Sequence, residues 1–348
     1  MAVAEEYVTA YRRLSEQVHE AGLARRRYGF YVTRLGGWIG GLALLIVAVP
    51  LLGTTWLQLV IAILIGVVMA QLGFLSHEAA HRQVFASRER NEWASRVIAG
   101  LLMGLSYGWW MDKHNTHHAR PNQEGEDPDL DSALLAFTPD TSDRRSRVGE
   151  VLSKRQGAFF LPLLLFEGVN LHLAALRTLL TTPGTPHRLL EIGMIIVRHS
   201  VGLTWLLVTL PMGMALAFVG VQVATFGLVL GGAFALNHIG MPTVPEGVRL
   251  DFLNRQVRMS RNIQDGPFVR FLMGGLQYQI EHHLFPIAPR PALPELKRIV
   301  RHECVRLGIP YTELTLREAY KAVVTYLNQV GLKNRDPYRC PLVQRYRG

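Results

Sequence analysis

Two long stretches without formal charge dominate the hydropathy pattern of the chain. Residues 35–76 and 201–245 contain no Asp, Glu, Lys or Arg. A transmembrane helix needs about 20 apolar residues, so the first stretch can hold two helices, as can the second together with the residues leading into it. Pro50 and Gly53 interrupt the first stretch and Pro211 the second, as expected of tight turns. We therefore predict an all-α integral membrane protein with four spans in two hairpins, at roughly 36–52, 56–76, 189–210 and 214–237.

The positive charges orient these predicted spans. Arg residues cluster before the first span, and Arg and Lys follow the second, whereas neither hairpin turn contains either residue. Cytosolic loops of membrane proteins carry an excess of Lys and Arg. The pattern therefore predicts that both termini and the large central segment lie in the cytosol.

Two further apolar segments are ambiguous. Residues 97–111 are too few for an ordinary span. Residues 158–180 include Glu167 and His172, which are costly in hydrocarbon. We interpret both segments as interfacial or re-entrant helices, which keeps the number of spans at four.

The remaining segments suggest three regions. Residues 1–34 have apolar side chains at helical spacing and are expected to form an amphipathic helix on the cytosolic face. Residues 35–288 form the membrane domain, whose cytosolic cap comprises 77–188 and 240–288. Residues 289–348 are polar and are expected to form a helical cytosolic tail. The apolar positions at helical spacing in the first region are Val8, Tyr11, Leu14 and Val18.

Composition supports a membrane protein. Hydrophobic residues make up 49% of the chain and charged residues only 18%, below the usual quarter or so for soluble proteins. The net charge is +10, but the basic residues flank apolar runs. We therefore expect membrane lipids, and no nucleic acid, as the anionic partner. Cys304 and Cys340 are interpreted as free thiols, because two cysteines make no disulfide framework.

Histidines gather in three short clusters. The first is His-Glu-Ala-Ala-His, the second is His-Asn-Thr-His-His, and the third is Gln-Ile-Glu-His-His. Residues three or four apart share one face of a helix, so each cluster presents several ring nitrogens together. An eighth histidine ends the last predicted span. The eight histidines are His77, His81, His114, His117, His118, His238, His282 and His283.

Seven or eight imidazoles are too many for one metal ion and fit two. Imidazole suits iron, copper, nickel and zinc, and spacing alone does not choose among them. A shared site requires every cluster to lie on one side of the membrane. Four spans meet that requirement, and a crossing by either ambiguous segment breaks it.

The three clusters, with one predicted hairpin before the first and the other between the second and third, resemble the integral-membrane fatty acid desaturase family. The resemblance covers roughly residues 30–310. The Gln that begins the third cluster resembles front-end acyl desaturases. The runs Asp-Lys-His-Asn-Thr-His-His at 112–118 and Asn-His-Ile-Gly-Met-Pro at 237–242 resemble bacterial acyl-CoA desaturases.

The resemblance implies a cytosolic cap that holds two iron ions through the clustered histidines. His238 occupies the position of an additional family ligand, with Asn237 as the alternative through a bound water. Gln279 is then expected beside the ligands, orienting a water or a ring. His172 and Glu167 are further candidates for lining the site, whereas His199 is interpreted as interfacial.

The resemblance also implies the chemistry and partners. O2 is the co-substrate, and two electrons come from outside. The substrate is a long-chain acyl-CoA or acyl-lipid. The chain lacks the His-Pro-Gly-Gly motif of a fused cytochrome domain, so a separate ferredoxin or reductase is expected as electron donor. The bacterial cytoplasmic membrane is the expected location.

Three alternatives compete with this interpretation. His77-Glu78-Ala79-Ala80-His81 also matches the zinc protease pattern, but an intramembrane protease leaves the other clusters unexplained. A related membrane di-iron hydroxylase would use nearly the same ligands. A non-enzymatic scaffold would hold no metal. The alternating acidic residues Asp127, Asp129 and Asp131 are interpreted as a surface turn.

Overall fold

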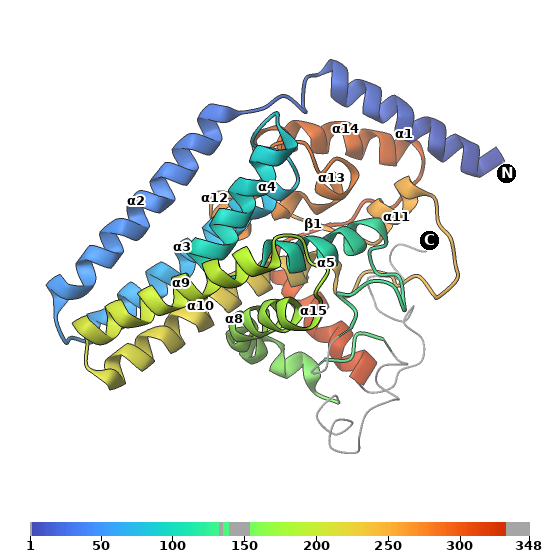
Figure 1. Cartoon of the computed structure of the whole chain (residues 1–348). Helices are drawn as coiled ribbons and strands as arrows, with labels where there is room; N and C mark the ends of the chain where they lie inside the picture. The colour runs from blue at the N-terminus through green and yellow to red at the C-terminus, as the bar shows by residue number, and fades with distance from the viewer. Residues whose placement is uncertain (1, 132–134, 139–153, 332–348) are drawn as a thin grey trace. The chain divides into compact units, whose positions relative to one another are not determined.

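The computed structural model describes residues 2–131, 135–138 and 154–331, which are mostly helical (Figure 1). The helices of the first half are α1 Ala2–Glu20, α2 Tyr28–Leu52, α3 Leu57–Ala80, α4 Arg88–Val97, the π-helix η1 Ile98–Met103 and α5 Tyr107–Ala119. Three long helices follow, α8 Gln156–Thr181, α9 Arg188–Thr209 and α10 Met212–His238. The elements of the last third are α11 Phe252–Arg258, β1 Asn262–Ile263, α12 Pro267–Met273, η2 Leu276–Tyr278, α13 Gln279–Leu284, η3 Arg290–Ala292, α14 Leu293–Arg306, β2 Glu313–Leu314 and α15 Leu316–Gly331.

The chain forms two compact units. Unit 1 comprises Met1–Arg25, Lys113–Leu161 and Ala233–Gly348, and unit 2 comprises Arg26–Asp112 and Pro162–Gly232. Three of the four boundaries fall within α5, α8 and α10, so each of these helices contributes to both units, and the fourth lies between α1 and α2.

Five helices of the described chain are long and apolar enough to cross a membrane: α2, α3, α8, α9 and α10. Four of them correspond to the four predicted spans. The fifth, α8, contains the segment that we expected to be interfacial or re-entrant, and it is one continuous helix of 26 residues. Its polar residues are too widely spaced to interrupt it, and Pro162 lies near its start. The expected count of four spans is therefore not confirmed.

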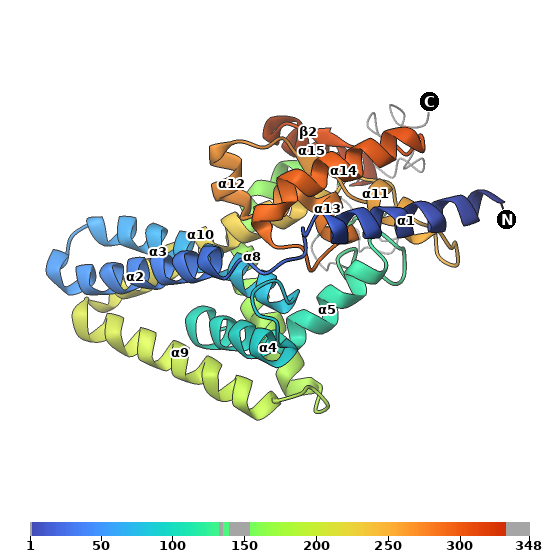
Figure 2. The same ribbon diagram turned by 90° about the horizontal axis from the view of Figure 1, so that it is seen from above.

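In unit 2, α2 and α3 lie side by side as a hairpin (Figure 2). Gly53 ends α2 with a φ of 59°, a conformation that favours glycine. The buried amide of Gln58 then donates 2.7 Å hydrogen bonds to the carbonyls of Val49 and Gly53. These bonds satisfy carbonyl groups at the end of α2 where the apolar chain reverses.

Residues 97–111, which we interpreted as an interfacial or re-entrant helix, do not form one continuous helix. The chain instead passes from α4 through η1, breaks at Gly104, where φ is 82°, and begins α5 at Tyr107. Glu191 from α9 stabilises this break. Its carboxylate accepts hydrogen bonds from the Ser106 hydroxyl at 2.5 Å and the Gly108 amide at 3.2 Å. It also forms a buried 2.9 Å ion pair with Arg96.

Helices α8 and α10 cross closely at glycines within unit 2. A Cβ atom on Gly227 would lie 2.2 Å from the backbone nitrogen of Gly168, and one on Gly168 would lie 2.3 Å from the Val223 carbonyl oxygen. Small residues allow helix backbones to approach in this way. A side chain at either position would force the two helices apart.

Unit 1 has a core made by α1, α11, α13 and α14. Ala10, Leu14 and Val18 of α1 are buried in it, and α1 lies beside α14 (Figure 1). Tyr11 donates a 3.1 Å hydrogen bond to the Leu284 carbonyl at the end of α13. The apolar stripe of α1 therefore packs on protein, while Val8 lies on the exposed face.

A short parallel pairing completes unit 1. β1 pairs with β2 through Asn262 opposite Glu313 and Ile263 opposite Leu314. Within the residues expected to form the tail, the described elements are η3, α14, β2 and α15. The rest of that tail, including Cys340, lies outside the described residues.

Candidate metal centre

The first histidine cluster lies at the C-terminal end of α3, in unit 2. The ring centroids of His77 and His81 are 4.7 Å apart, and the Trp110 ring lies 5.3 Å from His77. Burial, assisted by the neighbouring His77, lowers the pKa of His81 well below its usual value. His81 is therefore a neutral imidazole at neutral pH, which is the form that binds metal.

The second and third clusters meet within unit 1. α5 carries His114, His117 and His118, and α13 carries His282 and His283. The helical spacing places the rings on shared faces as predicted. For example, the centroids of His114 and His118 are 4.4 Å apart.

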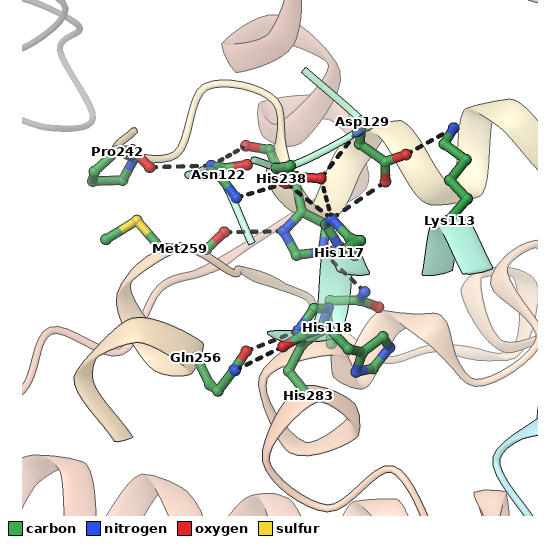
Figure 3. A network of polar contacts seen from close by, with 12 residues as sticks. Lys113, His117, His118, Asn122, Asp129, His238, Pro242, Gln256, Met259 and His283 are labelled. Atoms are coloured by element: carbon green, nitrogen blue, oxygen red, sulfur yellow. Dashed lines mark hydrogen bonds and ion pairs between the residues drawn. The ribbon is translucent and has the colours of Figure 1, made fainter. Parts of the chain in front are cut away.

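These residues and His238 divide into two groups of potential ligands. One ring nitrogen from each of His114, His118 and His282 lies within 4.8 Å of the others. The same holds for His117, His238 and His283, whose surroundings appear in Figure 3. Two sets of convergent imidazoles in one unit suit two metal ions.

The second group is oriented by three oxygen acceptors. His117 Nδ1 lies 3.0 Å from the Asp127 carboxylate, and His238 Nδ1 lies 3.0 Å from the Met259 carbonyl. His283 Nδ1 lies 2.9 Å from Gln256 Oε1, as Figure 3 shows. Because each acceptor is an oxygen, each Nδ1 carries the hydrogen. Each Nε2 then carries a lone pair, as in metal-binding histidines generally.

The Nε2 atoms of His117 and His238 are 3.3 Å apart. With both Nδ1 atoms protonated, two lone pairs face each other, which is unfavourable unless a cation or proton lies between them. Burial lowers the pKa of His117, but Asp129 and Asp127 raise it by more, so the net pKa is raised. The donor atoms and local charges therefore fit a bound metal cation.

Asn237 and Gln279 lie beside His238. Gln279 Nε2 is 3.0 Å from His238 Nε2. Gln279 Oε1 accepts a 3.0 Å hydrogen bond from the Asn237 side chain, and this bond fixes which end of the Gln279 amide faces the imidazole.

His172 and Glu167 lie on α8 in unit 2, and neither belongs to a group of three potential ligands among the described residues. His172 Nε2 is 3.0 Å from the Met103 carbonyl, and its ring lies edge-on to His199 at 5.3 Å. His199, which we interpreted as interfacial, lies in the middle of α9, a helix long and apolar enough to cross a membrane.

Sequence reasoning missed two side chains of this site. Asp127 was expected in a surface turn, yet it is 4% exposed and also accepts the Asn122 backbone N–H at 2.7 Å. Its position shortly after the second cluster was an available signal. Gln256 is fully buried and donates a 2.9 Å hydrogen bond to the His118 carbonyl. No pattern in the sequence distinguishes Gln256 from other glutamines.

Comparison with known proteins decides the family. A model of the fatty acid desaturase family matches residues 54–315. The chain belongs to the fatty acid desaturase family. It is thus an oxidoreductase of the acyl desaturase type, and the match covers all three histidine clusters and His238.

Several curated relatives are desaturases. The chain is 32% identical over 269 residues to an acyl-lipid (9-3)-desaturase of Physcomitrium patens, covering 75% of this chain and 51% of the relative. It is 29% identical over 326 residues to the Delta(6)-fatty-acid desaturase fat-3 of Caenorhabditis elegans, covering 89% and 73%. It is 28% identical over 347 residues to a Delta(8)-fatty-acid desaturase of Helianthus annuus, covering 94% and 74%. The chain thus spans about half the length of the moss relative and about three quarters of the other two.

Proposed function

We propose that this chain introduces a double bond into a long acyl chain, using O2 and two external electrons at a pair of histidine-bound irons. The observation that carries the proposal is the group formed by His117, His238 and His283. One ring nitrogen of each lies within 4.8 Å of the others, and oxygen acceptors hold all three Nδ1 atoms. The other group, His114, His118 and His282, lies on α5 and α13 and calls for a second metal.

We further propose that the seven clustered histidines and His238 are iron ligands, as the family pattern implies. His77 and His81 enter this set through their cluster, and the other six also through the geometry of unit 1. Bound iron would supply the reaction of O2 with an unactivated C–H bond. The chain supplies orientation, through the acceptors on Nδ1, and exclusion of water, because His117, His282 and His283 are at most 3% exposed.

The proposal favours two irons over one zinc. A zinc protease built on the first cluster needs Glu78 as a base and one further ligand. It gives no role to the six histidines that converge within unit 1. The relatives' names favour acyl-lipid or fatty-acid substrates. With Gln279 opening the third cluster, we propose a front-end type of desaturase.

We also propose the partners and location that the charge pattern and the family suggest. A separate ferredoxin or reductase delivers the electrons, and the substrate is an acyl-CoA or acyl-lipid. The site faces the cytosol of a bacterial cell, because Arg and Lys lie near the outer ends of the two predicted hairpins and are absent from their turns.

Expression with a reductase partner, followed by mass-spectrometric location of new double bonds in host lipids, tests the activity. The same analysis reports hydroxylated products. His117→Ala should retain membrane insertion but lose iron and product. His302→Ala, an exposed histidine of α14, is the control and should keep both. Full activity in His117→Ala would contradict the ligand assignment, and one zinc per chain would contradict the di-iron centre.

A further inference from the structure

Helix α12 exposes aromatic side chains on the surface of unit 1. Phe268 is 65% exposed and Phe271 is 46% exposed, whereas Met273 points into the core. Two exposed phenylalanines on a helix of seven residues form a concentrated apolar surface. Such surfaces mark contacts with a partner or a membrane.

Both ends of the segment containing α12 are fixed to one residue at the end of α10. The backbone N–H of Arg261 donates a 3.0 Å hydrogen bond to the Asn237 carbonyl. The side-chain amide of Asn237 donates a 3.1 Å hydrogen bond to the Leu276 carbonyl. The guanidinium of Arg261, which is fully buried, also donates to the carbonyls of Leu236 and Ile239. The segment from residue 261 to residue 276, which contains α12, therefore begins and ends beside the last turn of α10. This turn belongs to unit 1.

The position of the end of α10 sets the depth of the α12 segment relative to the bilayer. α10 has 27 residues, which at about 1.5 Å per residue gives about 40 Å, or the whole bilayer with its headgroup regions. Its last turn therefore lies near the membrane surface. α12 is about 10 Å long by the same rise, so its phenylalanines stay close to that depth.

The polar groups of α12 are also suited to a membrane interface. Arg270 forms a two-pronged ion pair with Asp265, with its Nε 2.8–2.9 Å from the two carboxylate oxygens. The pair cancels the formal charge next to the phenylalanines. Gly274 and Gly275 follow with positive φ angles of 56° and 104°, which turn the chain sharply back towards the core.

We propose that α12 inserts Phe268 and Phe271 into the interfacial layer of the bilayer that α10 spans. α12 then anchors unit 1 to lipid, in addition to the membrane-spanning helices. Through η2 the anchor leads directly into α13 and its ligands His282 and His283. It therefore fixes the depth of the third cluster relative to the lipid that supplies acyl chains.

Nitroxide labels report this depth directly. Phe268→Cys and Phe271→Cys are prepared in the full-length chain carrying Cys340→Ser, labelled, and placed in phosphatidylcholine nanodiscs. Val305→Cys on α14, where the native side chain is 73% exposed, is the matched control in the same unit. Collision rates with O2, which concentrates in lipid, are compared with those of a water-soluble nickel chelate.

At positions 268 and 271 collisions with O2 should exceed those with the nickel chelate, and at position 305 the order should be reversed. Nickel dominance at 268 and 271, as at 305, would overturn the proposal. Low accessibility to both reagents, with line broadening that grows with protein concentration, would also overturn it and indicate a second copy on this face. Iron content equal to that of the parent confirms that each variant is folded. The measurement needs no turnover, so its outcome is separate from that of the proposed activity.

Discussion

Asp127→Asn tests whether the orientation of His117 depends on a buried carboxylate. The carboxylate lies 3.0 Å from His117 Nδ1 through both of its oxygens. One oxygen also accepts the backbone N–H of Asn122 at 2.7 Å, and the other accepts that of Asp129 at 2.9 Å. Asparagine has the same shape, so the substitution removes the charge and one acceptor without creating a cavity.

The expected magnitude follows from these bonds. In the variant an amide NH2 replaces one oxygen and faces a backbone N–H that cannot pair with it. A buried donor left unsatisfied costs about 1–3 kcal/mol of stability. The hydrogen bond from His117 Nδ1 also loses its charged acceptor, which reduces the strength of that bond to about half. Loss of such a partner lowers metal affinity by about 10–100-fold, or about 1.4–2.7 kcal/mol.

Iron retention under chelator competition is the assay, read as metal per chain by mass spectrometry. Asp131→Asn is the matched control, because Asp131 lies in the same loop with an exposed side chain. Asp127→Asn should lose iron at a chelator concentration about 10–100-fold lower than the parent requires, and the control should match the parent. Unchanged retention in Asp127→Asn would refute the role given to this carboxylate.

Three further predictions concern packing, thiol reactivity and a second ligand partner. Gly227→Ala should lower the stability of the helix packing by about 1–3 kcal/mol through overpacking, and this loss should appear as a lower unfolding temperature in detergent. Gly220→Ala on the same helix is the control: no atom of a neighbouring element lies within 4 Å of its new methyl group, so its unfolding temperature should match that of the parent. Burial raises the pKa of Cys304 to about 12, so in the Cys340→Ser variant no thiol should react with a disulfide reagent at pH 8 until the protein is denatured. Gln256→Leu should release iron more readily than Gln256→Glu in the chelator assay, because only the glutamate can still accept the hydrogen bond from His283 Nδ1. Equal release from the two variants would show that this hydrogen bond does not affect iron binding.

The sequence was sufficient to predict an element where a local pattern, such as an apolar run or a helical spacing, carried the information. Runs of uncharged residues located α2, α3, α10 and the second half of α9, because membrane helices need continuous apolar length. The segment in α8 was harder to judge, since its few polar groups lower the average hydropathy without breaking the helix. The break at Gly104 could not be predicted, because it depends on the Glu191 carboxylate, more than eighty residues away.

Within the candidate site, local spacing predicted the potential ligands but not the residues that hydrogen-bond to them. Spacing of three or four residues predicted which rings share a helix face, because that geometry is local. It could not predict which helices converge. That depends on the packing of α5 against residues near the end of α10 and in α13.

The acceptors on Nδ1 show why this limit matters for function. They lie 10, 27 and 21 residues from His117, His283 and His238, respectively, so no periodic pattern connects them to the ligands. They also differ in chemistry: a carboxylate, a side-chain amide and a backbone carbonyl. Substitution can remove the first two, but the Met259 carbonyl survives any side-chain change there. The tautomer of His238 is therefore protected against point mutation. That of His283 depends on the single side chain of Gln256, whereas His117 has a second carboxylate within reach, because Asp129 Oδ2 lies 3.3 Å from its Nδ1.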